Sequence, residues 1–195
     1  MNFLGLDLSF TATGFYMIRD GAEALSFEID TKPADFGTDI ERADHIARAI
    51  VEKIGDVRPE MILIEDYYTG KQPGSVIKLA VLGTVVRVRL LEAGHSFVTL
   101  TASQIKKLET GKGVAPKDTM VKSVFKRHGF DTNSNNVADA CAMAYAAKAF
   151  YEWQNGRRDF LKYETEVLRK AGKEREVTVP YDVRANPDAV RIRKI

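Results

Sequence analysis

The sequence has little of what supports disulfides, zinc sites or membrane spans. It contains one cysteine, Cys141, which excludes a framework of internal disulfides, and its three scattered histidines show no zinc-finger spacing. No apolar run reaches the roughly 18 residues of a membrane helix. The first ten residues lack the basic stretch and long apolar core of a signal peptide. We therefore expect an intracellular, cytoplasmic protein with no membrane partner.

Neither sign of charge dominates the whole chain, so its net charge points to no class of partner. The 195 residues include 29 Lys and Arg against 27 Asp and Glu, a formal net charge of +2. The charge is unevenly distributed, however, because residues 104–127 carry seven basic and two acidic side chains. This basic cluster is typical of a surface that binds phosphates, and the alternative is a solvated helix face.

Short apolar segments alternate with helical patterns along most of the chain. Strands are expected at 3–8, 14–19, 22–29, 61–65 and 96–100, and helices at 40–54, 75–93, 117–128 and 135–152. This order predicts an α/β fold, with a five-stranded mixed sheet flanked by helices. Beyond residue 154 the composition becomes charged and polar. We therefore expect one domain at 1–154 and a charged C-terminal extension at 155–195.

Three acidic residues lie in settings that call for a partner. Asp7 lies inside an apolar strand, where an unpaired carboxylate is costly, and Glu65 ends another apolar strand. Asp139 lies in an alanine-rich helix, and Asn136 lies three residues earlier on the same helical face. The alanines would let this helix approach the sheet closely and bring Asp139 toward the other two acids.

Each acid taken alone has a simpler interpretation. Asp7 could cap a turn, Glu65 could be solvated at a strand end, and Asp139 could face water. Together, converging carboxylates without histidine are the ligand set of Mg²⁺ or Mn²⁺ rather than of zinc. Two such ions can activate water and stabilise the leaving oxygen in phosphodiester hydrolysis.

Five segments resemble the RuvC family of Holliday junction resolvases, within the RNase H-like superfamily. They follow the family's order at close to its spacing, and they are GLDLSFTATGFYMI (5–18), MILIEDYYTGK (61–71), KLAVLGTVV (78–86), SQIKKLETGKGVAPKDTMVKSVF (103–125) and NNVADACAMAYA (135–146). The resemblance covers about residues 1–150 and implies an RNase H-like nuclease domain. The chain drifts from bacterial resolvases in the manner of phage-encoded relatives, which act in the host cytoplasm.

The resemblance implies a role for each member of the acidic constellation. Asp7, Glu65 and Asp139 match the family's catalytic acids, which bind Mg²⁺ or Mn²⁺ as two ions in each active site. Lys106 and Lys117 match catalytic basic residues near the scissile phosphate.

One position departs from the family's pattern. The family commonly has a fourth acid three residues before the last one, and this chain has Asn136 there. An Asn carbonyl can ligate Mg²⁺ but brings no charge, so the second ion should bind more weakly unless another acid helps. Asp131 is the nearest spare carboxylate in the sequence.

Basic and aromatic residues complete the expected DNA-binding surface. Lys107, Lys112 and Lys122 belong to the basic cluster, whose interleaved glycines and proline indicate a flexible loop near DNA. Tyr67 and Tyr68 directly follow the second acid, and the resemblance places Tyr68 where an aromatic side chain can contact the junction. The alternative is that both rings simply pack.

These features predict a structure-selective endonuclease that cuts branched DNA, namely four-way junctions and forks. Metal-assisted attack by water would leave a 5′-phosphate and a 3′-hydroxyl. RuvC-like resolvases act as homodimers on two equivalent strands, so the resemblance implies a dimer, formed through the apolar helix at 75–93. Three alternatives stay open: a nuclease for RNA or RNA/DNA hybrids, an ATP-binding domain like those of actin and sugar kinases, which residues 5–14 also resemble, and a catalytically silent DNA-binding module.

Overall fold

A computed structural model describes residues 1–67, 73–174 and 177–180 of the chain. Its centre is the predicted five-stranded mixed sheet, in the order β3-β2-β1-β4-β5. The strands are β1 (Phe3–Asp7), β2 (Ala12–Ile18), β3 (Leu25–Asp30), β4 (Met61–Glu65) and β5 (Phe97–Leu100). The first three form an antiparallel meander, and β4 and β5 extend the sheet parallel to β1.

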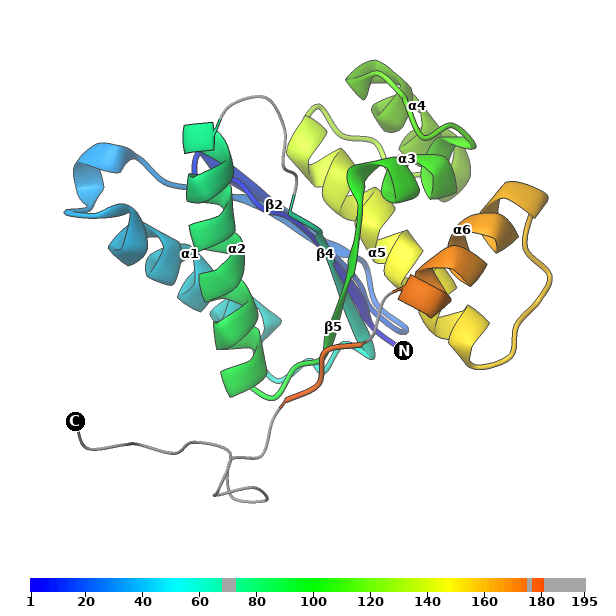
Figure 1. Cartoon of the computed structure of the whole chain (residues 1–195), viewed down its shortest axis with the longest axis horizontal. Coiled ribbons are helices and arrows are strands. Elements are labelled where there is room, and N and C mark those ends of the chain that lie inside the picture. The colour runs from blue at the N-terminus through cyan, green and yellow to red at the C-terminus, as the bar shows by residue number, and fades with distance from the viewer. Residues whose placement is uncertain (68–72, 175–176, 181–195) are drawn as a thin grey trace.

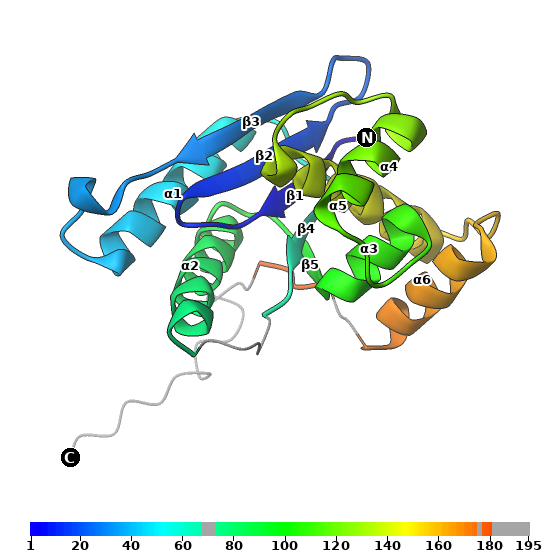
Figure 2. The same cartoon turned by 90° about the horizontal axis from the view of Figure 1, so that it is seen from above.

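Helices cover both faces of the sheet. On one face, α1 (Asp39–Ile54), preceded by the short 3₁₀ helix η1 (Pro33–Asp35), packs against α2 (Pro73–Glu92). The opposite face is covered by α5 (Asn135–Gln154), and Figure 1 and Figure 2 show the sheet between these two layers. Around α5 lie α3 (Ala102–Thr110), α4 (Lys117–His128) and α6 (Lys162–Glu174).

Alternation along the strands sends apolar side chains into two cores. Leu4 and Leu6 of β1 are buried with side chains of α1 and α2, whereas Phe3 of β1 and Leu63 of β4 are buried with side chains of α5. Because β1 and β4 are covered on both faces, their sequences are almost continuously apolar. A polar residue at the end of either strand therefore stands out.

The α5 helix approaches the sheet closely because small residues meet at the contact. A Cβ atom built on Gly5 would lie 2.0 Å from the carbonyl oxygen of Ala140, and one on Gly14 would lie 2.1 Å from that of Asn136. No larger residue fits at either strand position without moving the helix. The alanine-rich sequence of α5 thus brings the start of this helix directly over β1 and β2, as predicted.

The α3 helix is absent from the sequence prediction. Thr101 and Gln104 form a capping box at its start, in which the Thr101 side chain accepts from the backbone of Gln104 and the Gln104 side chain accepts from the backbone of Thr101. The helix has only nine residues, and the two buried apolar side chains it contributes are too few to form a periodic stripe. The strand ends also shift, because β2 begins at Ala12 and β3 begins at Leu25.

The C-terminal extension contributes to the core. Val167, Leu168 and Ala171 of α6 are buried in the core that surrounds α5, and α6 contacts α3 and α5. The boundary between residues 154 and 155 stays a prediction from composition. Among the described residues, no helix is both long and apolar enough to cross a membrane.

Candidate active site

The three predicted acids meet where β1 and β4 end. The register of these parallel strands brings Asp7 and Glu65 to the ends of adjacent strands, and neighbouring strands in a sheet lie about 4.8 Å apart. Gly5 and Leu63 lie two residues earlier and face α5, so both acids point to the α5 side of the sheet. Asp139 lies in the second turn of α5, on the helix that covers this side. The convergence predicted from the sequence is therefore present in the fold.

The carboxylates are close enough to influence one another's ionisation. Burial and the negative charges of Asp139 and Glu65 raise the pKa of Asp7 to about 8. Burial and Asp139 likewise raise the pKa of Glu65, and burial raises the pKa of Asp139. Asp139 thus makes Asp7 and Glu65 harder to ionise, and Glu65 adds to the effect on Asp7, a cost that a bound cation would remove.

Two lysines bring positive charge to these acids. Lys117, the first residue of α4, opposes the rise in the pKa of Asp7 and of Asp139. Lys106, on α3, does the same for Glu65 and Asp139. Both helices pack against α5, which explains how residues so far from β1 reach its end. The two lysines lie beside the acids, where the sequence predicts them.

The donor set suits a divalent cation that prefers oxygen ligands. Asp7, Glu65 and Asp139 are half-buried carboxylates with raised pKa values, and a bound cation would stabilise their charged forms. Across residues 1–67, 73–174 and 177–180, no group of three or more Asp, Glu, His or Cys side chains is arranged to hold a metal ion as it stands. The site thus fits Mg²⁺ or Mn²⁺ in chemistry, and a bound ion would have to draw the carboxylate oxygens together.

A fourth carboxylate, that of Glu28, lies beside Asn136, and no pattern in the sequence pointed to it. The Nδ2 of Asn136 donates a hydrogen bond to Oε1 of Glu28, on β3, at 2.8 Å. The hydroxyl of Ser134, which also caps α5, donates to the same oxygen at 2.6 Å. Glu28 also contributes to the raised pKa of Asp7. Asp131, the spare acid considered from the sequence, is exposed.

Arg87 of α2 holds the end of β4 from the opposite face of the sheet. Its Nη2 donates to the carbonyl oxygen of Glu65 at 3.2 Å, and its guanidinium lies 3.9 Å from the centre of the Tyr67 ring. The Tyr67 hydroxyl shares a hydrogen bond of 2.8 Å with that of Thr84. A pocket of about 200 Å³ opens here, lined in part by Asp7, Glu65, Tyr67 and Arg87. The ring of Tyr67 therefore packs against α2, and Tyr68 lies outside the described residues.

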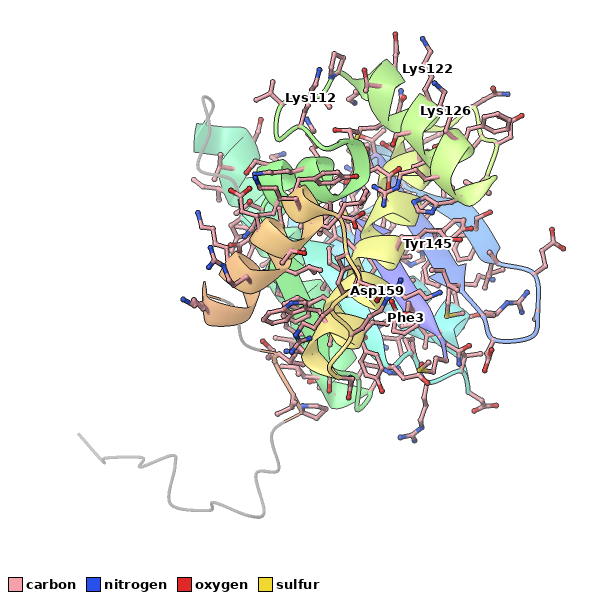
Figure 3. The ribbon with its side chains drawn as sticks, turned by 90° about the vertical axis from the view of Figure 1, so that its right-hand side faces the viewer. Phe3, Lys112, Lys122, Lys126, Tyr145 and Asp159 are labelled. Atoms are coloured by element: carbon pink, nitrogen blue, oxygen red, sulfur yellow. The ribbon has the colours of Figure 1, made fainter. Side chains whose placement is uncertain are left out.

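The remaining lysines predicted to bind DNA lie in two different environments. Lys112 and Lys122 are exposed, and Figure 3 shows them with Lys126 at one end of the molecule. Lys107 instead forms an ion pair of 2.9 Å with Glu166 of α6. Among the residues that the structure describes, two of the three lysines therefore have no acidic partner, and the third is engaged by the C-terminal extension.

Comparisons with known proteins cover the whole of this site. A family model described as "Crossover junction endodeoxyribonuclease RuvC" matches residues 3–147. The crossover junction endodeoxyribonuclease RuvC of Colwellia psychrerythraea is 30% identical over 147 residues, which are 72% of this chain and 83% of that protein. The protein of the same name from Synechococcus sp. is 27% identical over 148 residues, which are 74% of this chain and 96% of that protein.

A solved structure shares the fold. Thermus thermophilus RuvC, in complex with a Holliday junction substrate, aligns with a TM-score of 0.67 at 24% sequence identity. The alignment covers 80% of this chain and 96% of the Thermus chain. The architecture described above is therefore the RNase H-like fold.

Proposed function

Since this chain belongs to the RuvC family of crossover junction endodeoxyribonucleases, we propose that it resolves Holliday junctions and related branched DNA by hydrolysing phosphodiester bonds. The nucleases of this family depend on metal ions. One observation carries the proposal: acids from β1, β4 and α5 gather at the carboxyl ends of two inner strands, beside two lysines. All of these residues lie within the segment that the family model matches.

We assign metal binding to Asp7, Glu65 and Asp139, with the side-chain carbonyl of Asn136 as a weaker ligand. Asp7 is the central member, because its ionisation responds to both of the other acids. The Nδ2 of Asn136 donates to Glu28, which leaves Oδ1 available as a ligand. Two ions of Mg²⁺ or Mn²⁺, when bound, would supply positive charge at the attacking and leaving oxygens of the phosphodiester.

The other residues of the site orient the substrate and balance its charge. Lys106 and Lys117 lie where their ammonium groups can offset the charge that develops on the scissile phosphate. Arg87 fixes the backbone of Glu65 and the ring of Tyr67, so it is a positioning residue. Lys112 and Lys122 extend the positive surface away from the acids and would contact phosphates of the arms.

A dimer would allow two symmetric cuts in one junction. The α2 helix carries exposed apolar side chains at Ile77 and Val88, about three turns apart on one face, and this exposed face supports its assignment as the dimer contact. Each protomer would then present one acidic site to one of the two equivalent strands.

Cleavage of synthetic substrates tests this function. We expect the protein to cut a four-way junction and a fork in Mg²⁺ or Mn²⁺, with little cleavage of linear duplex or of an RNA/DNA hybrid of the same sequence. Asp7→Asn should remove the activity on all of them. Preferred cleavage of the hybrid would instead favour an RNA-directed nuclease, and ATP hydrolysis without DNA cleavage would favour an ATP-binding domain.

A further inference from the structure

The proposed metal site has one charge fewer than its relatives' pattern suggests, because Asn136 stands where an acid is common. Three carboxylates remain, on β1, β4 and α5. A neutral carbonyl ligand at the fourth position weakens the attraction for a second divalent ion. A carboxylate from another element of the fold could supply the missing negative charge.

The register of the sheet aligns a carboxylate of β3 with Asp7. Asp7 pairs with Gly14 of β2, and Gly14 pairs with Glu28 of β3, so the three residues form one row across neighbouring strands. Residues in such a row point to the same face, and here that face is covered by α5. Figure 2 shows the three strands side by side. Glu28 thus lies on the same side of the sheet as the site acids.

The middle residue of this row has no side chain, and the backbone of α5 takes its place. The carbonyl oxygen of Asn136 would lie 2.1 Å from a Cβ atom on Gly14. The backbone of residue 136 therefore lies over β2, between Asp7 on β1 and Glu28 on β3. Any charge on residue 136 or on Glu28 acts from nearly the same place.

Hydrogen bonds bring the carboxylate of Glu28 to the side chain of residue 136. Its Oε1 accepts from Nδ2 of Asn136 at 2.8 Å and from the hydroxyl of Ser134 at 2.6 Å. An aspartate at position 136 would place a second negative charge against Glu28, and the two would repel. Asn136 and Glu28 form a hydrogen bond, whereas Asp and Glu at these two positions would repel each other. The pair therefore carries one negative charge, and this charge lies on β3 rather than on α5.

We propose that Glu28 is the fourth carboxylate of the metal site and replaces the charge that Asn136 lacks. This inference rests on the proposed function. Glu28 is exposed, and within the described part of the chain its Oε2 has no hydrogen-bond partner, so this oxygen can turn toward an ion or toward water bound to one. The field of Glu28 already reaches Asp7, whose pKa it helps to raise.

Binding of Mn²⁺ to the DNA-free protein, measured by titration calorimetry, tests the inference without reference to cleavage. We expect Glu28→Gln to weaken the second Mn²⁺ equivalent by about 10- to 100-fold. Gln keeps an oxygen that accepts from Asn136 and Ser134, so this variant removes the charge and preserves the contacts. The matched control is Asp30→Asn, which removes the same charge two residues along β3, on the same face, and should leave binding nearly unchanged.

Moving the charge back to the helix is the stronger test. The double variant Glu28→Gln with Asn136→Asp should restore Mn²⁺ binding, because the single negative charge returns to position 136. The inference is overturned if Glu28→Gln binds as the wild type does, if Asp30→Asn weakens binding equally, or if the double variant binds no better than Glu28→Gln.

The same titrations separate this inference from the function on which it rests. If the wild type binds no Mn²⁺, or if Asp7→Asn binds it unchanged, then the assigned metal site is wrong. If Asp7→Asn loses binding while Glu28→Gln keeps it, the metal site stands and Glu28 only holds Asn136 in place. Thermal unfolding of each metal-free variant verifies that the fold is intact.

Discussion

Two groups of acids lie beside α5, and they differ in burial and in their pairing with basic side chains. Glu109 and Glu164 are almost fully buried, and each meets a basic side chain: His128 lies 2.9 Å from Glu109, and Arg127 lies 2.5 Å from Glu164. The three site acids are more open to solvent, and the two lysines beside them oppose the rise in their pKa values without forming an ion pair within the described part of the chain. The first group ties α6 to α3 and α4, whereas the second group is left short of positive charge.

This difference distinguishes an acid that stabilises the fold from an acid whose charge a bound cation would stabilise. Removing the partner of a buried ion pair leaves an uncompensated charge and costs about 3–5 kcal/mol. Removing one of several acids that repel one another relieves strain instead. A substitution in the first group should therefore lower stability and spare the chemistry, and one in the second group should do the reverse.

The largest expected effect is that of Asp7→Asn. We expect junction cleavage to fall by about 1,000-fold or more, because Asp7 is the central ligand of the proposed site. The metal-free variant should at the same time unfold at a higher urea concentration than the wild type at pH 8, because a half-buried negative charge has been removed. Single-turnover cleavage and urea unfolding measure the two effects. Lower stability in the variant would mean that Asp7 is paired as Glu164 is.

The opposite result is expected at Arg127. Its Nη1 donates to the carbonyl oxygens of Leu108 and Glu109, and its Nη2 donates to Glu164. Arg127→Met keeps most of the volume, removes these three contacts and the hydrogen bond to the Tyr163 hydroxyl, and should lower the free energy of unfolding by about 3 kcal/mol.

Cleavage per folded molecule should stay at the wild-type level in Arg127→Met, when both proteins are assayed well below their unfolding temperatures. Arg127→Lys is the matched control, since it keeps the charge but cannot form the same fork of hydrogen bonds, and it should lose less stability. A large loss of cleavage in the folded Met variant would show that the two groups of acids are not independent.

The three acids of the proposed site could be singled out from the sequence because each one interrupts a strong pattern. Asp7 and Glu65 end runs that are otherwise apolar, and Asp139 lies among alanines that allow close packing. Both strands are buried on two faces, so the pattern that predicts the strands also isolates their acids. The same physical cause explains why the sheet was predictable and the acids were visible.

Glu28 and α3 could not be found in this way. Glu28 lies in an edge strand with exposed positions, where an acid is ordinary, and its partner Asn136 is 108 residues away in the sequence. Only the strand register and the position of α5 relate them. The α3 helix depends on a local capping box between Thr101 and Gln104, whose spacing is informative only once a helix is suspected there.

A smaller effect separates the two classes of lysine. Lys117 opposes the raised pKa values of two site acids, whereas Lys122 is exposed further along α4. Lys117→Ala should lower the rate of cleavage at saturating junction by about 30-fold, because charge on the phosphate is no longer offset. Lys122→Ala should instead weaken junction binding and reduce its salt dependence by about one ion. Equal effects of the two substitutions on rate and binding would assign both lysines to the general basic surface.

The smallest expected effect is a dependence of stability on pH. Asp7 ionises near 3.8 in the unfolded chain and near a pKa of about 8 in the folded one. Between these values the folded protein holds a proton that the unfolded chain has released, so the stability from this site is complete below pH 4 and is lost as the pH rises to 8. We expect the metal-free protein to lose on the order of 1 kcal/mol over this window, a fraction of the value that the full shift would give, because water screens part of the charge on this half-buried carboxylate.

Mg²⁺ should reverse the sign of this dependence, and that reversal is the sharpest distinction between the two groups of acids. Binding requires ionised carboxylates, so stabilisation by Mg²⁺ should grow as the pH rises from 5 to 8. Asp7→Asn should flatten both profiles, while Arg127→Met should shift them downward without changing their slopes. Urea unfolding at a series of pH values, with and without Mg²⁺, measures all of these profiles. If the stability of the metal-free wild type does not depend on pH, then Asp7 is already ionised at neutral pH. A positively charged group of the protein would then stabilise this carboxylate before any metal ion binds.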